Sequence, residues 1–212
     1  MREDLFSWEL FSKVPIIGIV RNVSFEDLKN VLPQYYDAGL TNIEITMNTV
    51  QAQEMIRYAL DSYSSSLNIG AGTVCSEDDL NKALDAGAQF IVTPIINEKV
   101  ILNCVDRKIP IFPGAFTPSE IYKASSMGAT MIKIFPATTV GPSYINELKG
   151  PLDQVRLLPT GGVTLNNIES FREAGADGFG IGSQLFNKTL IKERNWEGLN
   201  SHFRKFVMKV QP

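Results

Sequence analysis

The chain contains very little of the residue types on which metal and nucleophile chemistry most often rely. Its 212 residues include one histidine, His202, and two cysteines, Cys75 and Cys104. His202 lies in Trp196–Val210, where apolar residues recur at helical spacing, so we interpret it as part of a packed helix face. The cysteines are far apart and show no metal-ligand spacing. Zinc-dependent chemistry and Ser-His-Asp catalysis are therefore disfavoured together.

The chain also lacks a strong charge, a long apolar run and a flexible linker. Its formal net charge is −3, with scattered charges, which argues against the basic stripe of a nucleic-acid groove. No stretch approaches the roughly 18 apolar residues needed to cross a bilayer, and segment 1–13 does not resemble a signal peptide. We expect residues 1–212 to form one cytoplasmic domain with no nucleic-acid or membrane partner.

What the chain does contain is a repeated pairing of a short apolar segment with an amphipathic one. The expected strands are Pro15–Val20, Asn42–Met47, Asn68–Val74, Phe90–Pro94, Ile109–Gly114, Met131–Pro136, Val155–Gly161 and Gly178–Ser183. The expected helices between them are Phe25–Ala38, Val50–Tyr63, Glu77–Ala86, Glu98–Arg107, Pro118–Met127 and Leu165–Ala174. Eight such repeats predict an α/β fold, a compact single-domain (β/α)8 TIM barrel. Segment Met1–Lys13 is expected to form an extra N-terminal helix over the N-terminal end of the barrel.

One charged residue interrupts an apolar strand. Lys133 lies within Met131–Pro136, and strand alternation places it on the same face as Phe135. A buried ammonium costs several kcal/mol unless it is paired or its pKa falls until it is neutral. A neutral amine in a pocket is a nucleophile for carbonyl carbon. An edge strand with a snorkelling lysine is the structural alternative.

Polar residues gather at the carboxyl ends of the expected strands, where a barrel holds its active site. Arg21 closes the first strand, Glu44 and Thr46 alternate with isoleucines in the second, Thr73 lies one residue before the end of the third, and Pro94 ends the fourth. A glutamate and a lysine inside one barrel would perturb each other's pKa, as expected of a catalytic pair. The alternative for Glu44 is a surface carboxylate on an exposed strand end.

Glycine pairs mark the ends of the last two expected strands. Thr160-Gly161-Gly162 leads into a helix expected to begin near Thr164, and Gly182-Ser183 ends the eighth strand. Loops at these two places form the usual phosphate site of a barrel, because glycine lets backbone N–H groups approach an oxyanion. Ser183 can add a hydroxyl donor. Ordinary turns also use glycine, but two pairs on adjacent strands favour a phosphate site.

These segments resemble the 2-keto-3-deoxy-6-phosphogluconate aldolases, their 6-phosphogalactonate relatives and the 4-hydroxy-2-oxoglutarate aldolases over nearly the whole chain. The motifs that carry the resemblance are Glu44-Ile45-Thr46, Gly70-Ala71-Gly72-Thr73-Val74, Pro113-Gly114, Thr117-Pro118-Ser119-Glu120, Lys133-Ile134-Phe135-Pro136-Ala137, Pro159-Thr160-Gly161-Gly162 and Gly182-Ser183. The resemblance implies a class I aldolase, a homotrimer of barrels, and no metal or other cofactor. It also implies a Schiff-base lysine at Lys133, a general acid/base at Glu44, and substrate contacts at Thr73, Pro94 and Phe135.

One position departs from the gluconate branch of this family. Many of its members carry an arginine four residues after the glutamate, where it binds the substrate carboxylate, but this chain has Asn48. Arg21, expected at the same rim, is the candidate for that role unless it pairs with Glu26 or Asp27. This chain is similar to the galactonate branch at both positions, since that branch has an asparagine after the glutamate motif and an arginine that closes the first strand. The sugar epimer preference stays open.

The expected substrate is a 2-keto-3-deoxy-6-phospho sugar acid of gluconate or galactonate type, cleaved to pyruvate and glyceraldehyde 3-phosphate. Lys133 would attack the C2 ketone, and Glu44 would remove the C4 hydroxyl proton. Gly161-Gly162 and Gly182-Ser183 would hold the phosphate. Two alternatives remain at this stage: an aldolase for an unphosphorylated substrate such as 4-hydroxy-2-oxoglutarate, and a phospho-sugar-binding barrel without turnover.

Overall fold

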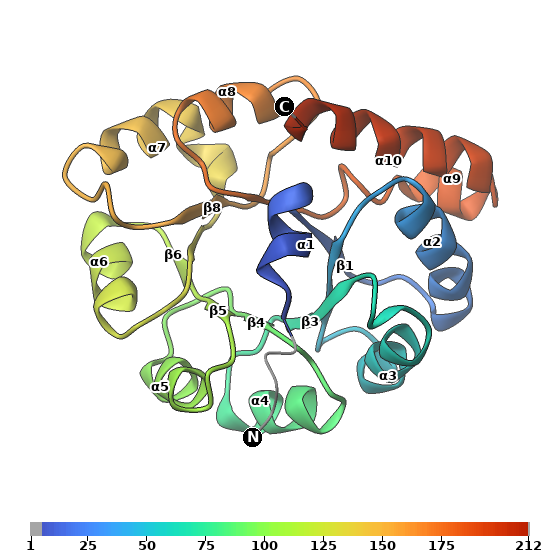
Figure 1. Cartoon of the computed structure of the whole chain (residues 1–212), viewed down its shortest axis with the longest axis horizontal. Coiled ribbons are helices and arrows are strands. Elements are labelled where there is room, and N and C mark those ends of the chain that lie inside the picture. The colour runs from blue at the N-terminus through green and yellow to red at the C-terminus, as the bar shows by residue number, and fades with distance from the viewer. Residues whose placement is uncertain (1–5, 212) are drawn as a thin grey trace.

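Short parallel strands lie at the centre of the molecule and helices surround them (Figure 1). The computed structural model describes residues 6–211. The strands are β1 (Ile16–Val20), β2 (Asn42–Thr46), β3 (Asn68–Gly72), β4 (Ile91–Val92), β5 (Ile111–Phe112), β6 (Gly114–Ala115), β7 (Ile132–Ile134), β8 (Leu157–Pro159) and β9 (Phe179–Ile181). These strands are buried along their whole length, as expected of a parallel sheet covered on both faces.

Helices alternate with the strands along the chain. They are α1 (Trp8–Lys13), α2 (Phe25–Asp37), α3 (Ala52–Tyr63), α4 (Glu77–Asp85), α5 (Glu98–Asp106), α6 (Pro118–Ser126), the 3-10 turn η1 (Ala137–Thr139), α7 (Gly141–Lys149), α8 (Ile168–Glu173), α9 (Lys188–Lys192) and α10 (Trp196–Val210). Local chemistry accounts for several of their starts. Ser76 and Thr117 each form a capping box with the acidic residue three positions later, which satisfies backbone donors at the helix start.

The strands form an α/β fold with a curled parallel sheet. One sheet has the order β5-β4-β3-β2-β1-β9 and a second has the order β6-β7-β8. β5 and the first residue of β6 fall within the expected strand Ile109–Gly114, which is interrupted at Pro113, a residue with no N–H to donate to a neighbour. A parallel bridge between Thr160 and Gly180 joins the end of β8 to β9. The observed order therefore follows the chain from β1 to β5 and from β6 to β8.

Aromatic side chains fill the N-terminal end of the curled sheet. Phe6, Phe11, Phe90 and Phe112 are buried there together, and α1 lies across the strands at the centre of Figure 1. Ser7 caps α1 by accepting a hydrogen bond from the Leu10 N–H at 3.2 Å. The expected N-terminal helix is confirmed from Trp8 onward, and residues 1–5 lie outside the described part. This end is closed by packing, which leaves the opposite end for a site.

Several expected element boundaries are wrong, each for a local reason. The helix expected from Val50 begins at Ala52 because Gln51 adopts a left-handed backbone with φ 61°. The helix expected to begin near Thr164 begins at Ile168, because the Asn167 side chain accepts a hydrogen bond from the Thr164 N–H at 2.7 Å and holds a turn. Several strands are shorter than expected, and helices α7 and α9 were not predicted.

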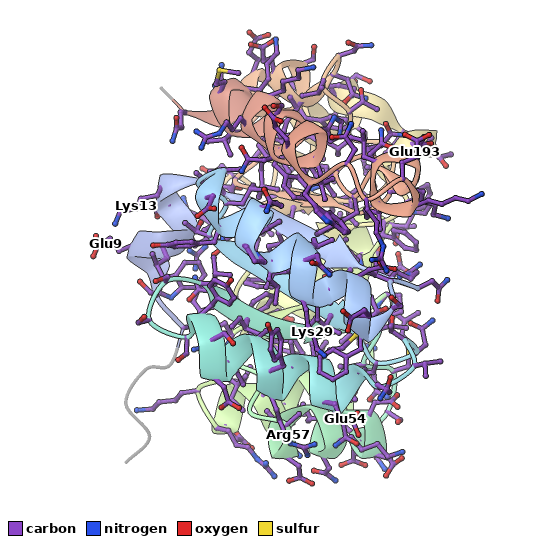
Figure 2. The ribbon with its side chains drawn as sticks, turned by 90° about the vertical axis from the view of Figure 1, so that its right-hand side faces the viewer. Glu9, Lys13, Lys29, Glu54, Arg57 and Glu193 are labelled. Carbon is purple, nitrogen blue, oxygen red and sulfur yellow. The ribbon has the colours of Figure 1, made fainter. Side chains whose placement is uncertain are left out.

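Charged side chains project from the outer faces of the helices. Figure 2 shows Glu9, Lys13, Lys29, Glu54, Arg57 and Glu193 directed away from the strands. Glu9 and Lys13 form an exposed ion pair at 3.0 Å on α1, of a kind that contributes about 0.3–0.5 kcal/mol. Between residues 6 and 211, no helix has both the length and the apolar character that a bilayer crossing requires.

Candidate active site

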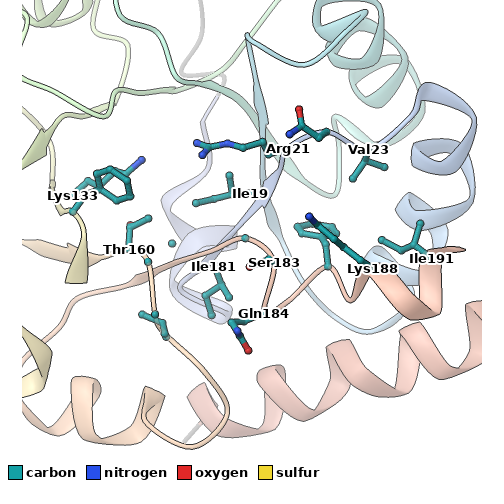
Figure 3. Close-up of a pocket in the computed structure, with 18 of the residues that line it drawn as sticks. Ile19, Arg21, Val23, Lys133, Thr160, Ile181, Ser183, Gln184, Lys188 and Ile191 are labelled. Carbon is teal, nitrogen blue, oxygen red and sulfur yellow. The ribbon is translucent and has the colours of Figure 1, made fainter. Parts of the chain in front are cut away.

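A cavity of about 600 Å³ lies at the carboxyl ends of the strands (Figure 3). Eight of the site residues predicted from the sequence line this cavity: Arg21, Lys133, Phe135, Thr160, Gly161, Gly162, Gly182 and Ser183. They come from β7 and from the segments that follow β1, β7, β8 and β9. The topology thus gathers residues that are up to 162 positions apart, from Arg21 to Ser183 (183 − 21).

Lys133 is the middle residue of β7, and its side chain is 3% exposed. β7 lies between β6 and β8, with Gly114 and Leu158 as the register partners of Lys133. The alternative of a snorkelling lysine on an edge strand is therefore wrong. The amine lies 5.0 Å from the centre of the Phe135 ring, which confirms that the two side chains share a face.

Burial lowers the pKa of the Lys133 amine below its ordinary value. The positive charge of Arg21 lowers this pKa further, while the negative charge of Glu44 opposes the shift. Burial is the largest cause because a low-dielectric surrounding disfavours the ammonium form. A larger share of neutral amine is what nucleophilic attack on a carbonyl requires.

Glu44 is equally buried, at 1% exposure in the middle of β2. Ile19 on β1 and Gly70 on β3 are its register partners, so the alternative of a surface carboxylate is wrong. Burial raises the pKa of the Glu44 carboxyl, and the positive charges of Lys133 and Arg21 oppose that rise. Within the described chain, Glu44 Oε1 is buried without a hydrogen-bond partner. Such an orphaned acceptor in a native fold calls for a functional explanation.

Gly72 provides the space that the Glu44 carboxylate occupies. A Cβ atom at Gly72 would overlap severely with Glu44 Oε1. Gly72 is the register partner of Thr46, two residues after Glu44 on β2. The small residue on β3 therefore explains how a carboxylate fits at this depth.

Arg21 and Thr73 meet at the rim above Glu44. Arg21 Nη2 donates a hydrogen bond to Thr73 Oγ1 at 3.3 Å. Thr73 has a left-handed backbone with φ 57°, which is unusual for a β-branched residue and recurs at functional sites. Glu26 pairs with Lys29 at 3.4 Å, and Asp27 accepts from Ser24 at 2.7 Å.

Among residues 6–211, neither acid forms an ion pair with Arg21, so that alternative is not supported. The guanidinium of Arg21 is exposed and lines the cavity. It is therefore placed to meet an anion that enters.

Four site residues predicted from the sequence do not line the cavity: Glu44, Asn48, Thr73 and Pro94. Glu44 and Thr73 are nevertheless coupled to it, Glu44 by its charge interaction with Lys133 and Thr73 by its bond to Arg21. Asn48 is exposed in the turn after β2. The backbone of Pro94 packs against Gly114, where a Cβ atom would collide with it. Pro94 therefore lies next to β6, the strand in which Gly114 is the register partner of Lys133.

The glycine pairs lie side by side on the cavity wall. Gly161 and Gly162 have φ values of 85° and 79°, a region that favours glycine. Asn167 Nδ2 donates to the Gly162 carbonyl at 2.8 Å and fixes this loop. The Thr160 hydroxyl donates to the Leu158 carbonyl at 3.2 Å. The loop is therefore held in shape by its own contacts.

The cavity also has lining residues that the sequence did not single out. They include Asn22, Val23, Gln184, Phe186, Lys188, Ile191 and Lys192. Most of these belong to α9 or to the loop before it. The sequence sign of helix α9 is Asn187, a helix cap, followed by the apolar Leu190 and Ile191. The helix has five residues, which are too few to show a clear helical period.

His202 and Cys104 both lie in packed regions outside the cavity. A ring nitrogen of His202 lies 2.8 Å from the Gln184 carbonyl, and the ring packs edge-on against Phe206, which confirms the packed helix face. Cys104 is buried, and its pKa is raised to about 12 by burial. Across residues 6–211, no group of three or more His, Cys, Asp or Glu side chains is arranged to hold a metal ion.

Comparison with known proteins gives a consistent result. The family described as "Aldolase: KDPG and KHG aldolase" matches residues 9–201. The chain is 34% identical to the 2-dehydro-3-deoxy-6-phosphogalactonate aldolase of Escherichia coli K12, over 94% of this chain and 98% of that protein. It is 32% identical to the 2-dehydro-3-deoxy-phosphogluconate aldolase of Haemophilus influenzae, over 94% and 95% respectively.

A solved structure described as "Native KDPGal structure" shares 32% identity and a TM-score of 0.86, covering 93% of this chain and 94% of that one. The family match spans most of the chain, and the relatives are covered almost completely. The chain therefore belongs to the KDPG and KHG aldolase family.

Proposed function

We propose that the protein is a class I aldolase for a 2-keto-3-deoxy-6-phospho sugar acid of gluconate or galactonate type. The products are pyruvate and glyceraldehyde 3-phosphate. The observation that carries this proposal is Lys133, a buried amine with a lowered pKa on the wall of a cavity, next to a buried carboxyl. The names of the relatives support the substrate class.

The first step joins the substrate to Lys133. The neutral amine attacks the C2 ketone, and loss of water gives a protonated imine. The imine is an electron sink next to the bond that must break. The Phe135 ring, 5.0 Å from the amine, covers one side of the nitrogen and limits its access to bulk water.

The second step breaks the C3–C4 bond. Glu44 accepts the proton of the C4 hydroxyl, directly or through one water, and the bonding electrons move into the imine. Glyceraldehyde 3-phosphate leaves, the enamine is protonated at C3, and hydrolysis releases pyruvate and restores the Lys133 amine. The orphaned Oε1 of Glu44 supports this role, because the substrate hydroxyl or a water would supply its missing donor.

Charged and polar groups at the two ends of the cavity orient the substrate. Arg21 holds the carboxylate by charge and hydrogen bonding, with Thr73 fixing the guanidinium. The N–H groups and hydroxyl of Gly161-Gly162 and Gly182-Ser183 hold the phosphate. Phe135 and Thr160 form the wall between the ends. On the basis of the family resemblance, Asn48 and Pro94 are further proposed contacts of the substrate.

The proposed assembly is a homotrimer of one-domain (β/α)8 barrels, residues 1–212, in the cytoplasm. Support for barrel closure comes from the Thr160–Gly180 bridge and from the assignment of β5 and β6 to one interrupted strand. Support for a subunit interface comes from Leu102 on α5 and Tyr122 on α6, which are 47% and 64% exposed. These two helices follow each other around the ring (Figure 1).

A cleavage assay with defined substrates tests the reaction. The purified protein is incubated with 2-keto-3-deoxy-6-phosphogluconate, its galactonate epimer and 4-hydroxy-2-oxoglutarate, and pyruvate release is followed. The expected result is equimolar pyruvate and glyceraldehyde 3-phosphate from at least one phosphorylated substrate, at a higher kcat/KM than for 4-hydroxy-2-oxoglutarate. Faster cleavage of the unphosphorylated acid would contradict the substrate class. Binding without turnover would contradict the enzyme assignment.

A further inference from the structure

The cavity continues past the glycine loops to helix α9. Its lining there includes Val23, Phe186, Lys188, Ile191 and Lys192. In Figure 3 the Lys188 side chain extends from α9 into the cavity on the side opposite Lys133, with Ser183 between them. A substrate attached to Lys133 and held at Ser183 therefore presents its distal end towards Lys188.

Positive charge dominates this cavity. Besides the Lys133 amine, its lining has the cations Arg21, Lys188 and Lys192 and the acid Asp27. Asp27 already accepts a hydrogen bond from the Ser24 hydroxyl at 2.7 Å. The ion pairs found within residues 6–211 leave Lys188 without a carboxylate partner. The α9 end of the cavity therefore offers a free ammonium to an incoming anion.

The backbone that carries Lys188 is anchored on both sides. Asn187 Oδ1 accepts from the Thr189 N–H at 3.0 Å and the Leu190 N–H at 3.2 Å. Phe186 is buried and stacks on Tyr35 at 5.8 Å, and Ile191 is buried as well. The start of the Lys188 side chain is thus fixed, while its exposed end can adjust to a bound group.

We propose that Lys188 determines the preference of this enzyme for a phosphorylated substrate. The inference rests on the proposed function and adds a residue to it. The glycine loops and Ser183 offer neutral hydrogen-bond donors, and such donors can bind a hydroxyl oxygen as well as a phosphate oxygen. Lys188 adds a charge, and hydrogen bonds that involve an ionised group are roughly twice as strong as neutral ones. A phosphate dianion gains from that charge and a neutral hydroxyl does not.

The condensation direction gives a matched pair of acceptors for a test. Pyruvate is combined with either glyceraldehyde 3-phosphate or unphosphorylated glyceraldehyde, and kcat/KM is measured for Lys188→Met, Lys188→Arg and Lys192→Met. Lys188→Met is expected to lose about 10- to 30-fold with the phosphorylated acceptor, about the loss of one charged contact, and less than about twofold with glyceraldehyde. Lys188→Arg is expected to retain most of the activity because it keeps the charge.

Two controls separate this role from general damage and from salt effects. Lys205→Met removes an exposed lysine on α10 and is expected to leave both rates unchanged. Added salt is expected to reduce the wild-type rate with glyceraldehyde 3-phosphate more than the Lys188→Met rate, since screening weakens exposed charges.

Several outcomes would overturn the assignment of Lys188. They are an equal loss with both acceptors, an unchanged Lys188→Met variant, or a selective loss in Lys192→Met instead. Trapping of pyruvate by borohydride is measured on the same samples. A wild type that forms no trapped adduct would contradict the proposed function itself, whereas a trapped adduct with no acceptor discrimination would contradict Lys188 alone.

Discussion

Glu44 and Lys133 are buried in the same interior, where each charge partly compensates the desolvation of the other. The pKa of the carboxyl is raised and the pKa of the amine is lowered, with burial as the largest cause of both shifts. Both groups are therefore moved towards their neutral forms, although not fully, because their opposite charges resist the change. A neutral amine can attack a ketone, and a carboxylate of raised pKa is a stronger base than an ordinary carboxylate.

Replacement of Glu44 by glutamine removes the proposed base and keeps the size of the side chain. General acid–base groups contribute about 10²–10⁴-fold, so kcat for cleavage should fall in that range. Imine formation with pyruvate should persist at a reduced rate. A loss of less than about tenfold would mean that another group or solvent removes the C4 hydroxyl proton.

The same variant has a definite effect on stability as the pH changes. Because the folded pKa of Glu44 is raised, the native state binds more protons than the unfolded state between the ordinary and the raised pKa. The wild type therefore loses stability as the pH rises through this window. Relative to wild type, Glu44→Gln should gain stability across the window and keep that gain above it. Denaturant titrations of both proteins at several pH values check the sign, and a stability difference in favour of Glu44→Gln that grows as the pH is lowered would contradict the raised pKa.

Arg21 is the proposed partner of the substrate carboxylate, in place of the neutral Asn48. Arg21→Ala should cost about 2–4 kcal/mol in kcat/KM, since it leaves an ionised group without its partner. The loss should be far smaller for a keto substrate analogue that lacks the carboxylate. Equal losses for both compounds would assign Arg21 to support of the rim and would leave the carboxylate to another residue.

Among the structural elements, β3 shows how one strand creates the space for a side chain of its neighbour. Gly72→Ala places a methyl group where the Glu44 carboxylate lies. Overpacking of this kind costs about 1–3 kcal/mol, and displacement of Glu44 should also lower kcat. Gly150→Ala is the matched control, because a Cβ there meets the Glu147 carbonyl at an ordinary 3.5 Å. An active Gly72→Ala variant of wild-type stability would show that Glu44 has another position available.

The elements also show which information a single sequence carries. The central strands and the pair Glu44 and Lys133 could be predicted because a charge within an alternating apolar run is a local signal. The bond between Arg21 and Thr73 and the fit of Gly72 against Glu44 depend on the register of neighbouring strands. That register involves two strands at once, so the pattern of one strand alone does not give these contacts.

The missed elements have a similar explanation. Helix α9 has five residues, too few to produce a helical period. The expected helix start near Thr164 was wrong because a side-chain bond from Asn167 stabilised a turn in its place. Pro113 divided one expected strand into β5 and β6. The sequence therefore indicated where the reaction centre lies, but it did not indicate the far wall of the cavity.

On the scale of the whole molecule, the exposed apolar side chains of α5 and α6 predict the interface of the proposed trimer. Leu102→Glu and Tyr122→Glu would place an unpaired charge in a subunit contact, which is unfavourable. Sedimentation equilibrium should show a trimer for the wild type and smaller species for both variants. Met208→Glu changes an exposed residue on α10 and should leave the trimer intact. A monomeric wild type would contradict the proposed assembly.

The imine at Lys133 is the central step of the proposed mechanism, and reductive trapping tests it most directly. The protein is treated with borohydride in the presence of pyruvate, digested, and analysed by mass spectrometry. We expect one reduced pyruvate adduct on the peptide that contains Lys133. We expect no adduct and no cleavage in Lys133→Arg, because arginine stays protonated. An adduct at another lysine, or near-normal turnover in Lys133→Arg, would contradict the account.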